Sequence, residues 1–162
     1  NEMTGAVLGA LLTKLDTIVA QLRHHAGVVY EGLQDIPGIR LRARPDPAGD
    51  IGYCVGFEMK DKAARDRCLQ ELRKRKVPAS TLTGSVLLPI QESVMNKRTR
   101  HPNWPSFQSP EGKAIPYGPD TCRQTLGVFD RFVLVRMGAK YTEKIDRYII
   151  DAVREEIGRA HV

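Results

Sequence analysis

The residues that could do chemistry gather in one long segment, from about Gly84 to Asp120. It contains six prolines, and its most notable cationic, amide and aromatic side chains are Arg98, Arg100, His101, Asn103 and Trp104. A loop of this length inside a compact domain is usually functional or disordered, and its aromatic content argues against disorder. Cations suit a phosphate or a carboxylate, and an indole suits the face of a ring. We therefore predict that these five residues contact a polar, anionic ligand that carries a ring.

The alternative is structural, with Trp104 and Phe107 pinning the segment to the core. The rest of the sequence assembles no catalytic set. It has no glycine-rich phosphate loop of either nucleotide-binding pattern, no Gly-x-Ser-x-Gly and no acidic pair that stands out from ordinary surface charge. The four histidines form no metal-ligand spacing with the cysteines. The residues alone thus predict a binding or structural part rather than a complete active site, and no metal site.

The composition is that of an ordinary globular protein. The chain has 162 residues, of which 41% are hydrophobic and 27% charged, and this length can build one domain with a real core. The net charge of +6 admits a nucleic-acid partner. However, the basic residues are spread along the chain, so a solvated basic surface or a small anionic partner is the preferred interpretation. Nucleic-acid binding would show as affinity that falls steeply with salt.

The cysteines and the hydropathy pattern bear on location. No run approaches the roughly 20 apolar residues of a transmembrane helix, and no signal-peptide pattern is present. Cys54, Cys68 and Cys122 are an odd number without Cys-x-x-Cys spacing. These features predict reduced thiols in a cytoplasmic protein with no membrane contact.

One long amphipathic helix is expected from Glu2 to about Gln34. Apolar residues recur there at steps of three and four, and Pro37-Gly38 ends the pattern. Asn1 can cap its first turn. A second apolar row widens the face of the N-terminal half, so we expect this half to be covered on more than one side. Two explanations stay open: a further N-terminal portion packs on the helix, or a self-contained domain uses it for dimerisation.

The remaining pattern predicts alternating strands and helices. Strands are expected at 39–42, 51–59, 77–82 (an edge strand) and 131–136, and helices at 62–74 and 120–126, while the composition of 44–50 predicts a turn. Asp61 is the expected cap of the 62–74 helix, and the cations at 73–76 complement the dipole at its C-terminal end. The small residues that alternate along 51–59 indicate a backbone or helix lying close to that strand. A last helix is expected between Thr142, as its cap, and Gly158, with a buried face made of Ile145, Tyr148, Ile149, Ala152, Val153 and Ile157. This order predicts an α+β fold with a small, mostly antiparallel sheet and flanking helices.

Several segments resemble a known family when taken in order. Asn1-Glu2-Met3-Thr4-Gly5-Ala6 is similar to the second half of the motif Asn-aromatic-Arg-Met-(Ser/Asn)-Glu-(Leu/Met)-x-(Ala/Gly)-Ala, and Leu15-Asp16 matches the Leu-Asp pair that follows it. This motif is typical of DegT/DnrJ-type sugar aminotransferases, which are pyridoxal phosphate (PLP) enzymes of the aspartate-aminotransferase fold class. Lys76-Val77-Pro78 resembles the family's Gly-(Ile/Val)-x. Other similar segments are Gly32–Leu41, Arg65–Leu72, His101–Trp104, Thr121–Thr125 and Tyr141–Glu156.

The resemblance implies a C-terminal part of such an enzyme. Residues 1–36 would form a long inter-domain helix and residues 37–162 the small C-terminal α+β domain of a fold-type I PLP enzyme. The activity implied is transfer of an amino group from glutamate or glutamine to a keto-sugar, often nucleotide-linked, by a homodimer. The loop residues Arg98, Arg100, His101, Asn103 and Trp104 would then contact the acceptor sugar.

The resemblance also has departures. Arg123 stands where the family usually has Pro, and Gly138-Ala139 replaces the usual loop before the last helix. The PLP-binding lysine and the acidic partner of the cofactor would lie upstream of Asn1, so this chain alone would be inactive and would not hold PLP. The alternative hypothesis is a stand-alone, non-catalytic module of the same fold that binds a ligand or dimerises.

Overall fold

A four-stranded antiparallel sheet forms the centre of the molecule. The computed structural model describes residues 1–83, 86–101 and 105–159. Within them the strands are β1 (Arg40–Leu41), β2 (Cys54–Glu58), β3 (Ala79–Ser80) and β4 (Phe132–Arg136), in the spatial order β1-β2-β4-β3. Each neighbouring pair is antiparallel. The predicted α+β class is confirmed, and each strand lies inside its predicted range, with β3 at an edge.

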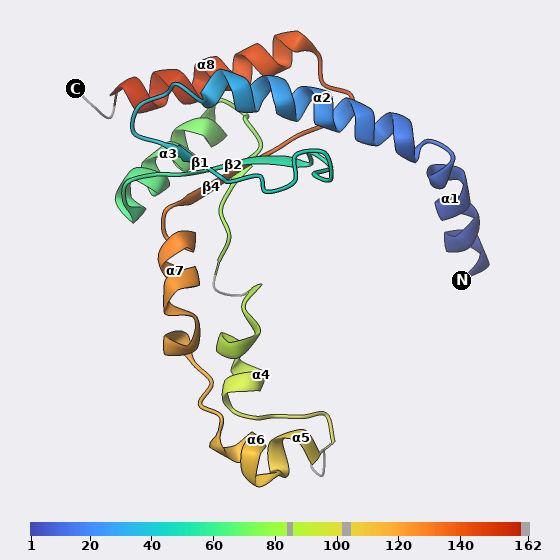
Figure 1. The fold of residues 1–162 in the computed structure, drawn as a ribbon, viewed down its shortest axis with the longest axis vertical. Helices are drawn as coiled ribbons and strands as arrows, with labels where there is room; N and C mark the ends of the chain where they lie inside the picture. Colours follow the sequence, from blue (N-terminus) through green and yellow to red (C-terminus); the bar gives the residue numbers. More distant parts are fainter. Residues whose placement is uncertain (84–85, 102–104, 160–162) are drawn as a thin grey trace.

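Three helices cover one face of this sheet. α2 (Leu15–Leu33) and α8 (Glu143–Arg159) lie side by side, and α3 (Lys62–Lys74) packs against α8, β3 and β4 (Figure 1). Because side chains alternate along a strand, one face of the β2–β4 pair presents its apolar residues to the helices. The sheet and these three helices are called the body below. Its fully buried core includes Val29, Leu33, Phe57, Leu72, Val133, Val135, Ile149 and Val153.

Helix α3 has defined signals at both ends. The Asp61 carboxylate accepts a hydrogen bond from the Ala64 amide at 2.7 Å, which is the predicted cap. At the other end the amides of Lys76 and Val77 donate to the carbonyls of Arg73 and Leu72, each at 2.9 Å. This bond pair is a Schellman motif, and it places Lys76 in the left-handed region with φ of +60°.

The small residues near β2 do mark a close approach, as predicted. A Cβ at Gly52 would lie 2.7 Å from the carbonyl oxygen of Leu22 in α2, and Gly52 has a positive φ of +72°. The strand therefore begins directly under α2, where only glycine fits. On the other face of the sheet the Phe132 ring lies over Gly56, whose Cβ would be 2.5 Å from the ring.

The prediction of one continuous N-terminal helix is wrong. The structure has α1 (Glu2–Leu12) and α2, which meet at a 60° bend. At the break the Thr13 hydroxyl donates to the Ala10 carbonyl, and Lys14 has φ of −108° and ψ of 0°. A hydroxyl that bonds the preceding turn favours a helix bend. The Asn1 cap is confirmed, since its side chain accepts from the Thr4 amide at 2.9 Å.

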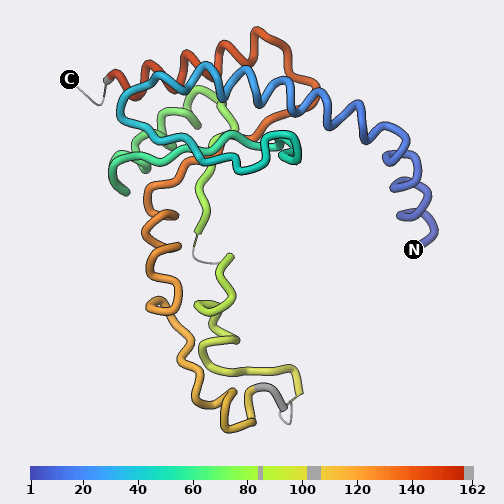
Figure 2. Tube along the Cα trace, viewed as in Figure 1, coloured from blue at the N-terminus to red at the C-terminus, as the bar shows by residue number. Residues whose placement is uncertain are grey.

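Helix α1 has no buried residue, so its apolar row is open where we expected cover. The exposed side chains are Met3, Val7, Leu8, Leu11, Leu12 and, at the start of α2, Leu15. Figure 2 shows this end of the chain turning away from the body. No single helix in the described ranges is long and apolar enough to cross a membrane; α1 and α2 reach that threshold only as a pair, across the bend.

The last helix is also slightly longer than expected, and its buried face is narrower. Gly158 does not end it, because α8 continues to Arg159. Ile149, Ala152, Val153 and Ile157 are buried as predicted, but Ile145 and Tyr148 are largely exposed. The Tyr148 hydroxyl donates to the carbonyl of Arg75, the residue that caps the C-terminal end of α3, at 2.9 Å.

Between β3 and β4 the chain leaves the body as a long projection, here called the arm (residues 82–131). Figure 1 shows it extending from the sheet to a tip far from α2 and α8. The predicted loop contains short helices, with the predicted 120–126 helix falling across η3 and α7. In chain order the arm comprises η2 (Leu88–Ile90), α4 (Glu92–Met95), α5 (Pro105–Gln108), α6 (Pro110–Ala114), η3 (Pro119–Cys122) and α7 (Arg123–Phe129).

Candidate functional site

Three of the five predicted ligand-binding residues lie in the arm just after α4. Arg98, Arg100 and His101 are exposed, while Asn103 and Trp104 lie outside the described residues. The guanidinium of Arg98 is 3.3 Å from the Glu92 carboxylate, and both side chains are mostly in solvent. Such a pair contributes little to stability, so the Arg98 charge stays available to a ligand. The assignment of these residues to a ligand site remains a prediction.

The fold of the arm turns this cationic stretch outward. The amides of Lys97 and Arg98 donate to the carbonyls of Val94 and Ser93 at 2.9 and 2.7 Å, so α4 ends in a second Schellman motif. Lys97 occupies its left-handed position, with φ of +51°. Its amine donates to the Lys113 carbonyl and lies 6.0 Å from the centre of the Tyr117 ring. Lys97 therefore ties α4 to the α6 side of the arm.

The aromatic residues that are described pack within the arm. Phe107 meets Tyr117 edge-on, with 5.9 Å between ring centroids. This contact joins α5 to the segment after α6, so Phe107 is pinned to another part of the arm. Only Gly112 is buried among the arm residues whose burial is described. Local contacts, rather than a core, thus hold the arm together.

An apolar groove lies where the arm joins the sheet. It has a volume of about 460 Å³, which is in the range of small-molecule sites. Its apolar wall includes Leu41, Leu82, Phe129 and Phe132, and Arg40, Arg42 and Glu58 stand at its polar side. Glu58 is already paired, 2.8 Å from Arg40 and 3.4 Å from Arg131.

Sequence reasoning took 44–50 for a plain turn and missed an ion cluster around Asp50. The Asp50 carboxylate lies 2.6 Å from Arg42 and 3.4 Å from Arg44, and it accepts from the Gly52 amide at 2.9 Å. The backbone hydrogen bond and the two arginines lower the pKa of Asp50. Arg23 of α2 donates to the Asp50 carbonyl at 2.9 Å. The cluster thus connects the β1–β2 loop to α2. In the sequence, the alternation of Arg40, Arg42 and Arg44 is the signal that could have indicated an acidic partner nearby.

The body also buries titratable groups that have no role in a ligand site. His25 Nδ1 of α2 lies 2.7 Å from the Asp146 carboxylate of α8, and Asp146 is fully buried. Burial and the nearby Glu156 raise the pKa of the Cys68 thiol to about 12. Burial also raises the pKa of Cys54. Both thiols therefore stay protonated near neutral pH and are poor nucleophiles.

The described residues do not form a site that fits PLP. That cofactor needs a lysine amine held in a pocket. Every described lysine is exposed except Lys97, which is half-buried and bonded to the Lys113 carbonyl. A surface depression of about 600 Å³ contains Lys60 and Lys62, but both side chains lie in solvent. Among all the residues that the structure describes, no three His, Cys, Asp or Glu side chains are grouped to hold a metal ion.

The comparisons with known proteins come from structure. No protein-family model matches the sequence, and a search of curated proteins finds no match. The structure of S. venezuelae DesV in complex with a ketimine intermediate matches 96% of this chain and 36% of its own length, with 19% identity and a TM-score of 0.67. For 3-amino-5-hydroxybenzoic acid synthase these values are 98%, 39%, 16% and 0.67. For a DegT DnrJ EryC1 StrS aminotransferase from Brucella abortus they are 94%, 35%, 17% and 0.60.

The chain therefore has the fold of one part of aminotransferases. Besides the DegT DnrJ EryC1 StrS aminotransferase, the matches include a sugar aminotransferase from Micromonospora echinospora. The part in question is that of DegT/DnrJ-type sugar aminotransferases, so the resemblance seen in the sequence motifs is confirmed for the fold. This chain spans little more than a third of the length of those structures.

Proposed function

We propose that this chain is the C-terminal part of a PLP-dependent sugar aminotransferase. The observation that carries the proposal is the fold match, which covers nearly all of this chain and about a third of each enzyme. The order of the sequence motifs supports it independently. In this proposal residues 1–36 run between two domains, and residues 37–162 form the small domain, into whose core the second half of α2 packs.

The exposed apolar row of α1 supports a larger partner domain. A contiguous apolar surface without cover usually marks an interaction site. We assign its cover to the large, PLP-binding domain, which would also supply the lysine and the acidic residue that the described residues lack. When bound, PLP supplies the electron sink for amino transfer. The intact enzyme would be a homodimer, and the unpaired cysteines are in keeping with a cytoplasmic location.

The arm is assigned to the acceptor. Arg98, Arg100 and His101 project from it into solvent, with Asn103 and Trp104 in the same stretch. Guanidinium groups pair with phosphate or carboxylate in a bidentate manner, which suits a nucleotide-linked keto-sugar. The amino donor, glutamate or glutamine, would be bound elsewhere. The apolar groove lies at the base of the arm, between the arm and the sheet.

The test separates the two halves of the reaction. The full-length protein that carries this chain, purified with PLP, should convert its cofactor spectrum on addition of L-glutamate or L-glutamine. Arg98→Gln and Trp104→Ala should raise the KM for the keto-sugar about tenfold while sparing this donor half-reaction. Arg154→Gln on α8, far along the chain from the arm, is the matched control and should change neither. Equal loss in both halves would mean that the arm residues are structural.

One observation favours a second candidate, a stand-alone binding module. The body has a complete core of its own, built from its sheet and three helices. Such a module would pair through α1 with a second copy and bind its ligand without PLP. It predicts a dimer whose dissociation exposes α1, and no change in any cofactor spectrum with amino donors.

A further inference from the structure

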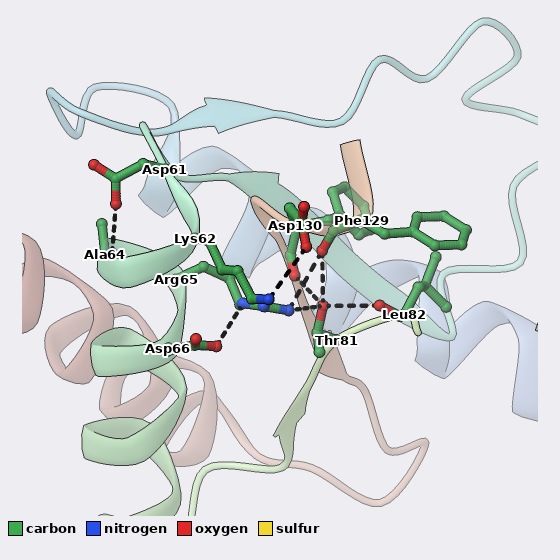
Figure 3. A network of polar contacts seen from close by, with 10 residues as sticks. Asp61, Lys62, Ala64, Arg65, Asp66, Thr81, Leu82, Phe129 and Asp130 are labelled. Carbon is green, nitrogen blue, oxygen red and sulfur yellow. Dashed lines mark hydrogen bonds and ion pairs between the residues drawn. The ribbon is translucent and has the colours of Figure 1, made fainter. Parts of the chain in front are cut away.

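The base of the arm is held by one buried arginine. Arg65 lies on α3, and only 6% of its surface is exposed. Its Nη1 donates to the Thr81 hydroxyl at 2.9 Å and to the Phe129 carbonyl at 3.4 Å (Figure 3). Thr81 directly follows β3, and Phe129 ends α7 just before β4. The two ends of the arm, with the residues that join them to the sheet, are called its roots: 81–82 is the outgoing root and 129–132 the returning root. A single guanidinium nitrogen therefore contacts both roots.

The two roots are also joined to each other through Thr81. Its hydroxyl oxygen lies 2.7 Å from the Phe132 carbonyl and 3.3 Å from the Phe129 carbonyl. Figure 3 shows Arg65, Thr81 and Phe129 converging at this point, with Leu82 beside them. Hydrogen bonds to a charged donor are stronger than neutral ones. The network thus fixes the start and the end of the arm against the first turn of α3.

The charge of Arg65 is balanced at the edge of the network. The Asp66 carboxylate lies 2.8 Å from its Nε, but the alignment is outside hydrogen-bonding geometry, so the contact is electrostatic. A buried guanidinium is costly unless it is paired and bonded. Lys62 and Asp130, 3.9 Å apart, add only a solvent-exposed ion pair nearby. The side chain that sets the geometry is therefore Arg65.

We infer that Arg65 is a positioning residue that fixes the orientation of the arm, and with it the acceptor side of the site. The role in substrate binding rests on the function proposed above; the role in orienting the arm does not. Gly112 is the one buried residue among the arm residues whose burial is described, so the direction of the arm is set mainly at its roots. Three residues of the roots, Leu82, Phe129 and Phe132, also form the wall of the apolar groove. Arg65 thus fixes the groove together with the arm.

The test measures arm orientation directly in the full-length protein. Spin labels are placed at Ser93→Cys on α4 and Asp151→Cys on α8, both exposed, in a Cys122→Ser background. Cys54 and Cys68 are buried and should not be labelled. The parent should give one narrow distance distribution by pulsed electron spin resonance. Thr81→Val and Arg65→Lys should broaden it, because each removes bonds that join the two roots.

The control is Arg67→Lys, the same substitution on the exposed face of the same helix, and it should leave the distribution narrow. Thr81→Val keeps the shape of the side chain, so it answers the question even if the arginine variant fails to fold. A narrow distribution in folded Thr81→Val would overturn the inference. The expected companion effect is a roughly tenfold rise in the KM for the keto-sugar with the donor half-reaction unchanged. A broad distribution with an unchanged KM would keep the orienting role and refute the placement of the acceptor on the arm.

Discussion

The body and the two projections, α1 and the arm, are built by different means. The body is built around a core of fully buried side chains, among them Phe57 and Leu33. α1 buries nothing, and the arm is held by local turns and by Arg65 at its base. The body is therefore stable through its own packing, whereas the projections depend on caps, turns and root contacts. Surface that a chain leaves uncovered is the surface available for a partner or a ligand.

The largest expected effect comes from making the same Leu→Ala substitution at a buried and at an exposed position. Leu33→Ala at the buried end of α2 should lower the free energy of unfolding by about 3 kcal/mol, because it leaves a cavity in the core. Leu12→Ala at the end of α1, where the side chain is 67% exposed, should change it by less than about 0.5 kcal/mol. Urea unfolding of both variants at low protein concentration is the measurement. An equal cost would show that α1 is covered.

The buried contact between His25 of α2 and Asp146 of α8 gives the next largest effect. His25→Ala leaves the Asp146 carboxylate inside the body with no side-chain partner, and its Oδ1 already lacks a hydrogen bond in the described structure. We expect the free energy of unfolding of this variant to fall by about 2–3 kcal/mol. His24→Ala, the neighbour on the exposed face of α2, is the control and should be nearly neutral. Similar decreases in the melting temperature of His25→Ala and His24→Ala would contradict a stabilising contact between His25 and Asp146.

Alkaline pH should weaken the body through Cys68. Its pKa is raised from 9.0 to about 12 in the fold, so the folded state keeps the thiol proton that the unfolded chain loses. The stabilisation that Cys68 gives the folded state is fully present below pH 9. It is lost as pH rises towards 12, and the free energy of unfolding falls by at most about 1.4 kcal/mol per pH unit. Urea unfolding between pH 8.5 and 10.5 should show the slope. Cys68→Ala should remove it, and an unchanged slope would assign it to another group.

The smallest predicted effect compares the two left-handed lysines. Lys76→Gly ends α3 without steric cost and should stabilise the body by about 1 kcal/mol. Lys97→Gly has the same backbone advantage but loses the contacts of its amine with the Lys113 carbonyl and the Tyr117 ring. It should not stabilise the chain, since it loosens the arm. Thermal unfolding of both variants is the measurement. A higher melting temperature for Lys97→Gly would mean that the contacts of the Lys97 amine do not stabilise the arm.

Sequence reasoning performed differently on the two kinds of region. Alternation along 51–59, the Asp61 cap and the cations after α3 predicted β2 and α3 because local signals and burial agree there. The bend at Thr13 was missed, since apolar periodicity continues through it and only a hydroxyl-to-carbonyl bond marks it. The short helices of the arm were missed because a proline-rich segment without periodic burial gives no pattern to count.

The sequence predicts which residue types would make up the candidate site, and this stays a prediction, but it does not predict the geometry of the contacts around it. The sequence pointed to the stretch around Arg98 and His101 by residue type alone. It gave no sign that Arg65 contacts Thr81 and Phe129, because these partners are 16 and 64 residues away. Lys76 is partly predictable from the sequence. The family motif that it resembles has Gly at this position, and the positive φ of Lys76 is a conformation that favours Gly.

We propose that the body folds on its own, whereas α1 is covered by a further domain. Amide hydrogen exchange tests it most directly, on residues 1–162 alone and within the longer protein that we propose carries them. We predict slow exchange in α2, α3, α8 and the sheet in both samples, and fast exchange in α1 that becomes slow only in the longer protein. Slow exchange in α1 of the isolated chain at every dilution, or fast exchange in both samples, would contradict the account.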